Sequence, residues 1–342
     1  MNKLSILAII SISILTISLF ACKRKHKLDI DTSNINVDIT IYRFEKDLLS
    51  VDTNSIEASL SILKKKYDKF YDIFFNNIIV DRSKDTLHKN TVLKFITNSD
   101  FINLNNDVLK EYPDVKNLKQ NLVEAFKHYK YYFPEKKLPT VVTFISGFEN
   151  AIVNIDNILA IGLDMFLGKD YKTYLHVGFP KYIINRLSKE YIVPIAMQGF
   201  GKQEFSINDT DKSFINQMLY EGKILYFVDA MLPHLPDDLK LGYTKSQLNW
   251  ALQYEPEIWT NFIDEDVLYT SDQRKYNKYI EEAPFSSGFY SDSAPRLASF
   301  TGLQIVRSYM ANNPDITLPQ LMEEQNPIKI LNASKYKPQS KK

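Results

Sequence analysis

The stretch SFINQMLYEGKILYFVDAM, residues 213–231, carries apolar side chains on every side of a helix drawn through it. Such a pattern predicts a buried central helix, because a surface helix needs a polar face. Glu221 lies in the middle of this stretch. An isolated buried carboxylate is costly, so it must be paired, protonated or close to water. Two interpretations follow: an internal ion pair with a basic residue such as Arg307 or Lys223, or a general base.

Helical periodicity continues on both sides of this stretch. Residues 56–74 carry apolar side chains at steps of three and four, which predicts one long amphipathic helix. In the stretch 293–312, Pro295 is expected in the first turn of a helix. Further helices are predicted over residues 92–96, 118–129, 180–191 and 244–253, and after the capping box that begins at Thr317.

Strand-like sequence is confined to a few short runs. Residues 141–145, 151–153 and 158–163 are rich in β-branched side chains and lie close together, which predicts a small antiparallel sheet. Residues 37–42 alternate with period two and predict one more short strand. No linker rich in Pro, Gly or Ser divides the chain. The expected fold class is therefore α+β and predominantly helical, with a single globular domain over residues 37–338 whose part 37–137 is a helical N-terminal layer.

Composition excludes several classes of function. The chain has 342 residues, with 42 Lys and Arg against 41 Asp and Glu, so no net field gathers phosphate backbones and nucleic acid is not expected as a partner. The single cysteine, Cys22, cannot form an internal disulfide. The five histidines show no ligand spacing, and no nucleotide-binding or nucleophile motif is present. The sequence thus predicts no metal and no cofactor.

The N-terminus has the layout of an export signal. Lys3 precedes an uncharged apolar run over residues 4–20, which predicts a signal peptide over residues 1–21. The run ends in LFAC, residues 19–22, which resembles the lipobox of bacterial lipoproteins. That resemblance implies that Cys22 is acylated and anchors the chain in a bilayer. The alternative is an uncleaved membrane-spanning helix, since the run approaches the roughly 20 residues needed to span.

A short linker follows the cysteine. Residues 22–36 are expected to hold the lipidated cysteine and a polar spacer. The basic run KRKHK, residues 23–27, is either a solvated part of this linker or a collar resting on anionic headgroups.

Several motifs together resemble one family. They are YRFE (42–45), AIGLDMFLG (160–168), MLYEGKILYF (218–227), WA (250–251), IW (258–259), GLQIVRSYM (302–310) and SKYKP (334–338). These motifs look like those of the gliding-motility-associated lipoprotein family GldB of the Bacteroidetes, over almost the whole chain beyond the signal peptide. The resemblance implies a palmitate-bearing lipoprotein, attached to the cell membrane and facing the periplasm, whose partners are other gliding or envelope proteins. It leaves open whether the inner or the outer membrane is occupied.

The family is in turn similar to predicted zinc-dependent proteases that carry H-E-x-x-H, so residues 138–338 are expected to be a degenerate zincin-like part. On this chain that motif falls on residues 220–224, where Glu221 is kept but Tyr220 and Ile224 replace the two histidines. Tyrosine is a poor zinc ligand and isoleucine is none, so no catalytic metal site is expected. Glu221 and Arg307 are then structural, and Gly302 allows close helix packing.

The expected function is a non-catalytic scaffold or binding component. One alternative is an active hydrolase or peptidase that uses Glu221 together with Tyr220. Another is a glycan- or peptidoglycan-binding module, which the many aromatic residues suggest: the chain has 21 Tyr and 21 Phe.

Overall fold

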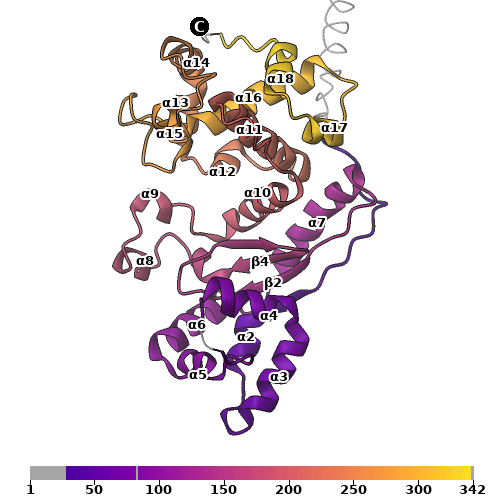
Figure 1. Ribbon diagram of the computed structural model, residues 1–342, viewed down its shortest axis with the longest axis vertical. Coiled ribbons are helices and arrows are strands. Elements are labelled where there is room, and N and C mark those ends of the chain that lie inside the picture. The colour runs from indigo at the N-terminus through magenta and orange to yellow at the C-terminus, as the bar shows by residue number, and fades with distance from the viewer. Residues whose placement is uncertain (1–27, 82–83, 340–342) are drawn as a thin grey trace, which may run out of the picture. The chain divides into compact units, whose positions relative to one another are not determined.

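A computed structural model describes residues 28–81 and 84–339 of the protein. The chain divides into two compact units, residues 1–31 and 32–342, and the second contains all the helices and strands discussed below (Figure 1). The expected signal peptide over residues 1–21, Cys22 and the basic run 23–27 lie outside the described residues. Within the described part of the chain, no helix combines the length and the apolar character needed to cross a bilayer.

A mixed four-stranded sheet lies at the centre of the N-terminal half of the second unit. Its strands are β1 (Ile41–Arg43), β2 (Thr140–Phe144), β3 (Ile152–Ile155) and β4 (Ile158–Gly162), in the order β1-β2-β4-β3. Only β3 and β4 are antiparallel, because a two-residue turn joins them. The prediction of an antiparallel sheet was therefore wrong. β2 pairs in parallel with both β1 and β4, and strands of this kind are usually buried on both faces.

Side-chain hydrogen bonds, in addition to those of the backbone, hold β1 against β2. Beyond the end of β1, the buried Glu45 accepts a hydrogen bond from Arg43 Nε at 2.8 Å. The other carboxylate oxygen of Glu45 accepts one from Thr143 Oγ1 of β2, also at 2.8 Å. The YRFE motif thus joins an edge strand to the middle of the sheet.

Helices of the N-terminal layer cover one face of the sheet (Figure 1). They are α2 (Phe44–Leu49), α3 (Ile56–Tyr67), α4 (Lys69–Ile73), α5 (Lys89–Thr97) and α6 (Ser99–Glu111). Phe44, Phe70 and Phe74 pack in a cluster of aromatic rings against Phe144 of the sheet. The single helix predicted over residues 56–74 is in fact broken at Asp68, which has φ 43°, and continues beyond α4 as a π-turn over Phe74–Ile78. With a ψ of −118°, Asp68 lies outside the left-handed helical region, in a conformation that L-residues rarely adopt, so the α-helical hydrogen bonding stops there.

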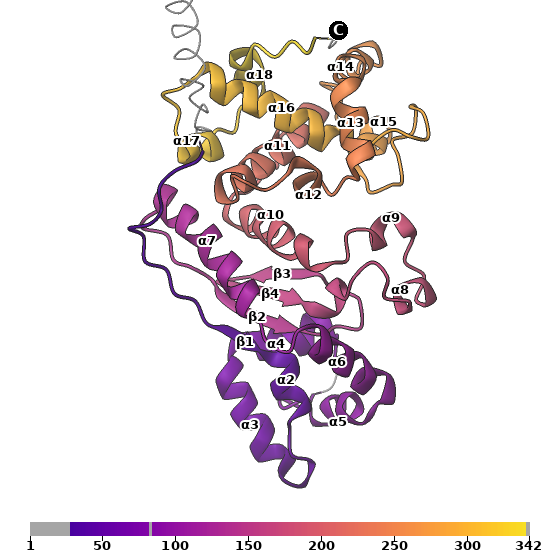
Figure 2. The same ribbon diagram turned by 180° about the vertical axis from the view of Figure 1, so that it is seen from behind.

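Helix α10 (Ile192–Glu204) packs on β3 and β4, on the face of the sheet away from the N-terminal layer, and α7 (Lys116–Tyr132) lies beside it (Figure 2). Sequence periodicity did not predict α10, because Pro194 and two glycines interrupt its pattern. Pro194 lies in the first turn, where no intrahelical N–H partner is required. Gly199 and Gly201 lie against Asn154 and Phe227, so small residues fit both contacts.

The C-terminal half is a layer of helices around α11 (Phe214–Met231) and α16 (Leu297–Asn312). Pro295 lies two residues before α16 rather than in its first turn, because the helix begins after Arg296, whose φ of 49° is left-handed. The capping box at Thr317 is present as predicted. The other helices of this half are α12 (Asp237–Leu241), α13 (Lys245–Gln253), α14 (Glu255–Asp264), α15 (Gln273–Ile280), α17 (Leu318–Glu323) and α18 (Pro327–Ser334). Two short helices, α8 (Thr173–His176) and α9 (Lys181–Ile184), lie in the chain between β4 and α10.

Candidate functional site

Helix α11 is buried over most of its length, as its sequence predicts. It contacts α7, α10, α12, α15, α16, α17 and α18. Ser213 caps its first turn by accepting a hydrogen bond from Asn216 N. The residues that occupy the positions of H-E-x-x-H lie near the middle of this helix, so what their side chains touch decides what chemistry they can do.

Glu221 is paired at the edge of the helix layer. Its Oε1 accepts a hydrogen bond from Lys202 Nζ of α10 at 2.7 Å, and its side chain is 25% exposed. The expected partners, Arg307 and Lys223, do not contact it; each binds other acceptors. Glu221 is therefore a half-buried carboxylate held by a lysine, and no other carboxylate or histidine forms a metal-binding group with it within the described residues.

The two positions where zinc proteases carry histidine hold side chains that serve packing. Tyr220 donates a hydrogen bond from its hydroxyl to Phe205 O at 3.0 Å. Burial, and secondarily the charge of Glu221, raise the pKa of Tyr220 to about 12, so the phenol stays neutral. Ile224 is fully buried. Neither side chain supplies a ligand that zinc prefers, so these residues do not fit the metal that the zinc-protease likeness implies.

Lys223 points to the other side of α11. Its ammonium donates to Glu324 O at 2.7 Å and to Met322 O at 3.4 Å, which joins the helix to the C-terminal end of α17. Burial lowers the pKa of Lys223 to about 8, although the charge of Glu324 acts against this shift.

Helices α11 and α16 cross at a pair of glycines. A Cβ added at Gly222 of α11 would lie 2.3 Å from the carbonyl carbon and oxygen of Gly302 in α16. A Cβ added at Gly302 would lie 2.0 Å from Met218 O. Only glycine lets two backbones approach so closely. A side chain at either position would therefore push the two helices apart.

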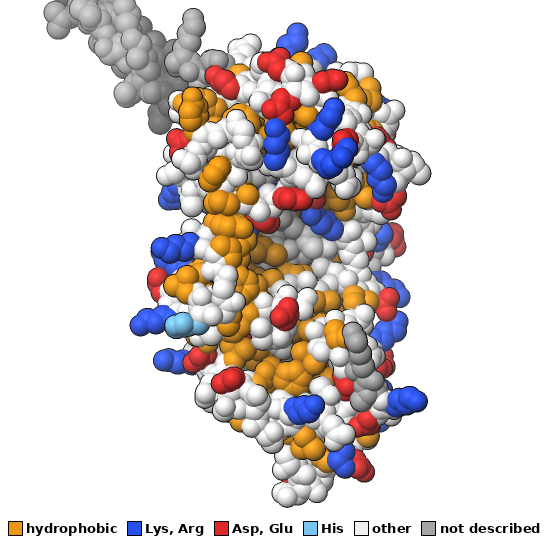
Figure 3. Space-filling view, turned by 60° about the vertical axis from the view of Figure 1, so that its left-hand side comes forward, with side chains coloured by type: hydrophobic (Ala, Val, Ile, Leu, Met, Phe, Trp, Pro, Cys, Tyr) orange, Lys and Arg blue, Asp and Glu red, His pale blue; other side chains and the backbone are white. Residues whose placement is uncertain are grey.

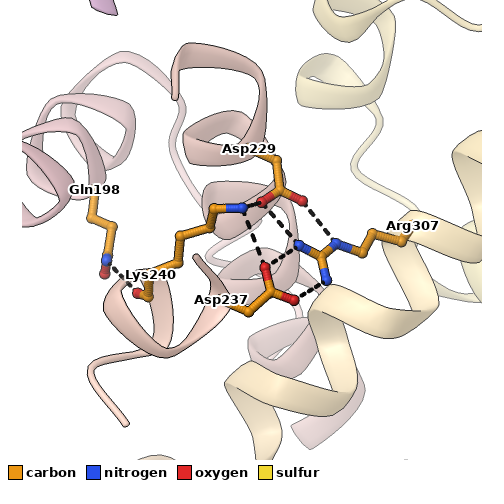
Figure 4. A network of polar contacts seen from close by, with 5 residues as sticks. All are labelled: Gln198, Asp229, Asp237, Lys240 and Arg307. Carbon is orange, nitrogen blue, oxygen red and sulfur yellow. Dashed lines mark hydrogen bonds and ion pairs between the residues drawn. The ribbon is translucent and has the colours of Figure 1, made fainter. Parts of the chain in front are cut away.

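Arg307 belongs to a network of charges that joins three helices (Figure 4). Its guanidinium binds two carboxylates in bidentate fashion: Asp229 of α11 at 2.8 and 3.0 Å, and Asp237 of α12 at 2.7 Å through both nitrogens. Lys240 lies on the other side of both carboxylates, 2.6 Å from Asp229 and 3.2 Å from Asp237. Its backbone carbonyl accepts a hydrogen bond from Gln198 of α10, which extends the network to a fourth helix.

The network is electrically balanced and internally satisfied. Asp229 and Lys240 are almost fully buried, and two acids face two bases. Burial by itself raises the pKa of Asp237, but the hydrogen bonds and charges of Arg307 and Lys240 outweigh it and lower the pKa to about 2. Asp237 is therefore ionised at neutral pH, and because Arg307 and Lys240 occupy its oxygens it is not poised to accept a proton from a substrate. The network acts as a clamp between helices.

Sequence reasoning missed this network. Asp237 and Asp238 form the first turn of α12, a helix that the sequence periodicity did not predict. A signal for Asp229 was nevertheless present, because it is a second carboxylate in the apolar stretch that contains Glu221.

Comparison with known proteins agrees with the motifs. The family model described as "Gliding motility protein GldB" matches residues 25–338. The chain belongs to the GldB lipoprotein family. No curated protein and no solved structure was found that matches it. As a member of this family it is a gliding-motility lipoprotein, which implies attachment to a membrane and partners in the motility machinery.

Proposed function

We propose that this member of the GldB family is a non-catalytic scaffold or binding component of the gliding apparatus, anchored by an acylated Cys22 and facing the periplasm. In this proposal residues 138–338 derive from a zincin-like body whose metal site has been lost. One observation carries it: the side chains of the degenerate motif are used to hold helices together, since Tyr220, Glu221 and Lys223 bind Phe205, Lys202 and Glu324 respectively.

A peptidase would use these side chains differently. A metalloprotease needs ligands that activate a water molecule and a carboxylate within hydrogen-bond reach of it. Here the carboxylate is bound to a lysine, and the positions on either side are a neutral phenol and a buried aliphatic chain. The nearby carboxylates that do converge, Asp229 and Asp237, are saturated by Arg307 and Lys240.

Glu221→Gln tests the proposal in cells. Glutamine keeps the shape of the side chain and can still accept a hydrogen bond from Lys202, so gliding and protein abundance are expected to match those of the wild type. Lys202→Gln is the matched control, because it alters the same pair from the other side. Loss of gliding in a stable, abundant Glu221→Gln protein, with Lys202→Gln unaffected, would count against the proposal. So would stoichiometric zinc in the purified protein together with chelator-sensitive peptide hydrolysis.

A further inference from the structure

A groove of about 900 Å³ lies in the N-terminal half, away from α11. It is bounded by α5 and α6 on one side, and by the turn at residues 147–148 and the segment 171–177 on the other. On this face of the molecule hydrophobic side chains gather in a hollow (Figure 3). The volume is within the range of binding sites for small ligands and short peptide stretches.

The groove has an aromatic floor. Phe95 and Phe101 meet edge to face with ring centroids 4.4 Å apart. Phe148, whose ring contacts Tyr171 and Tyr174, also lines the groove, as does Val177, which is 53% exposed. Contiguous apolar surface of this kind, with polar residues around it, is typical of interaction sites.

Phe148 is held in position at a conformational cost. Gly147 and Phe148 have φ angles of 74° and 71°, a conformation that is rare for a bulky residue. The buried carboxylate of Asp164 fixes this turn by accepting hydrogen bonds from Ser146 N at 3.1 Å and from Phe148 N at 2.7 Å. Strained residues that the surroundings hold in place are concentrated at binding sites, because they present a side chain in a fixed position.

The charges of the groove favour a cation. Within the described residues, the carboxylates of Asp81, Asp100 and Asp107 and the ammonium of Lys94 line it, and Asp81 is already paired with His88 at 2.9 Å. Asp107 accepts a hydrogen bond from Tyr171 across the groove at 2.8 Å. Asp100 is exposed, and within the described residues its carboxylate has no hydrogen bond or ion pair. An unpaired carboxylate beside an apolar floor attracts a basic side chain and repels an acidic one.

We propose that this groove binds a basic, aromatic-containing extended segment of a partner protein. Two arginines of that segment pair with Asp100 and Asp107, one with each, because these carboxylates are seven residues apart on α6 and so about 10 Å apart along its axis. An aromatic or aliphatic side chain packs among Phe95, Phe101 and Phe148. Side chains of Asn103 and Thr91, which also line the groove, offer hydrogen bonds to an extended backbone. The proposal does not depend on whether Glu221 is catalytic, so it can be refuted without refuting the function proposed above, and the reverse.

Peptide binding to the full-length lipidated protein tests it. The protein is placed in phosphatidylcholine nanodiscs, which carry no net charge, and titrated into three fluorescein-labelled octapeptides while anisotropy is recorded. The first peptide alternates arginine with phenylalanine, the second glutamate with phenylalanine, and the third arginine with glycine. We expect saturable binding of the first only, because the groove demands both charge and apolar area.

Two variants and two matched controls locate the binding. Asp100→Lys is expected to weaken binding of the arginine–phenylalanine peptide by about tenfold or more, because an attraction becomes a repulsion. Asp315→Lys makes the same charge change at an exposed position outside the groove and should leave affinity within about twofold, as expected for a distant charge. Val177→Ser should weaken binding by about threefold or more through lost apolar contact. Leu175→Ser, on a residue 56% exposed that does not line the groove, should have little effect.

Several results would overturn the proposal. Equal losses in Asp100→Lys and Asp315→Lys would mean that only net charge attracts the peptide. Equal binding of the glutamate–phenylalanine peptide, or no saturable binding of any peptide, would also reject it. Saturable binding of a soluble disaccharide-pentapeptide from peptidoglycan, with no binding of the arginine–phenylalanine peptide, would assign the groove to a glycan ligand instead. All four substitutions are at exposed positions, and unchanged thermal unfolding confirms that each variant is folded.

Discussion

Replacing Gly302 by alanine should destabilise the C-terminal half strongly, even though alanine is the better helix former. The added Cβ would lie 2.0 Å from Met218 O and 2.9 Å from Met218 C, both backbone atoms of α11. An ordinary contact needs about 3.4 Å or more. No rotamer change can relieve a clash between a Cβ and a backbone, so α11 and α16 must move apart.

The expected net loss is about 2–4 kcal/mol in the free energy of unfolding. Overpacking of a tight core costs about 1–3 kcal/mol, and the separation also loosens buried side chains along both helices, at a further cost of about 2 kcal/mol. Against this, alanine gains about 1 kcal/mol over glycine in helix propensity. The clash prevails because it involves two backbones at the centre of the layer.

Urea unfolding of the full-length protein in a mild non-ionic detergent measures this loss, followed by far-UV circular dichroism. Gly201→Ala is the matched control, since its Cβ would meet only the edge of the Phe227 ring at 2.9 Å, and a side chain can shift. Its stability should stay within about 1 kcal/mol of the wild type. The reasoning is refuted if Gly302→Ala is as stable as Gly201→Ala.

Three further predictions concern single side chains. Arg307→Met should lower the free energy of unfolding in urea by about 3 kcal/mol, because it leaves two carboxylates with one lysine. Adding Asp237→Asn should restore part of this loss by rebalancing the charges. If the losses of the two single variants simply add in the double variant, the clamp is contradicted. Burial raises the pKa of Asp164 to about 6, against backbone hydrogen bonds that lower it, so its contribution to stability falls as pH rises from about 4 to above 6. The free energy of unfolding of Asp164→Asn, measured relative to that of the wild type, should therefore rise by up to about 3 kcal/mol between pH 4 and pH 7. If the free energies of unfolding of the two proteins change in parallel with pH, this linkage is excluded. Cys22→Ala should abolish lipid labelling and release the protein from membranes, and unchanged retention would favour a spanning helix.

Local sequence patterns predicted the features that depend only on neighbouring residues. The apolar run of α11 predicted a buried helix, and the Thr317 motif predicted a cap, because both depend on neighbouring residues. The order of the sheet depends on pairs far apart in the chain, such as Tyr42 with Val142, and nothing local specifies that these strands run parallel. The break at Asp68 was hidden because the apolar spacing continues through it.

The partner of Arg307 shows why the site was harder to predict than the fold. Sequence periodicity places Arg307 on α16 but does not set the height of α16 relative to α11. The crossing of Gly222 with Gly302 sets that height. Arg307 lies five residues beyond Gly302, about 8 Å along the helix, and Asp229 lies seven residues beyond Gly222, about 10 Å. Asp229 therefore meets Arg307, while Glu221 remains beside the crossing and turns to Lys202.

The position of β1 has a mechanical consequence. If the chain is tethered through Cys22, tension on the tether reaches β1 before any other strand of the body. β1 is only three residues long, and its backbone is hydrogen-bonded to a single neighbour, β2. A pull along the strand must shear its hydrogen bonds and the Glu45–Thr143 contact together, whereas a sideways pull would peel them one after another. The Asp38–Lys119 ion pair precedes β1, so under such a pull the YRFE segment is the first strand of the body, rather than the first contact, to resist being drawn out, and the direction of pull sets how firmly it does so.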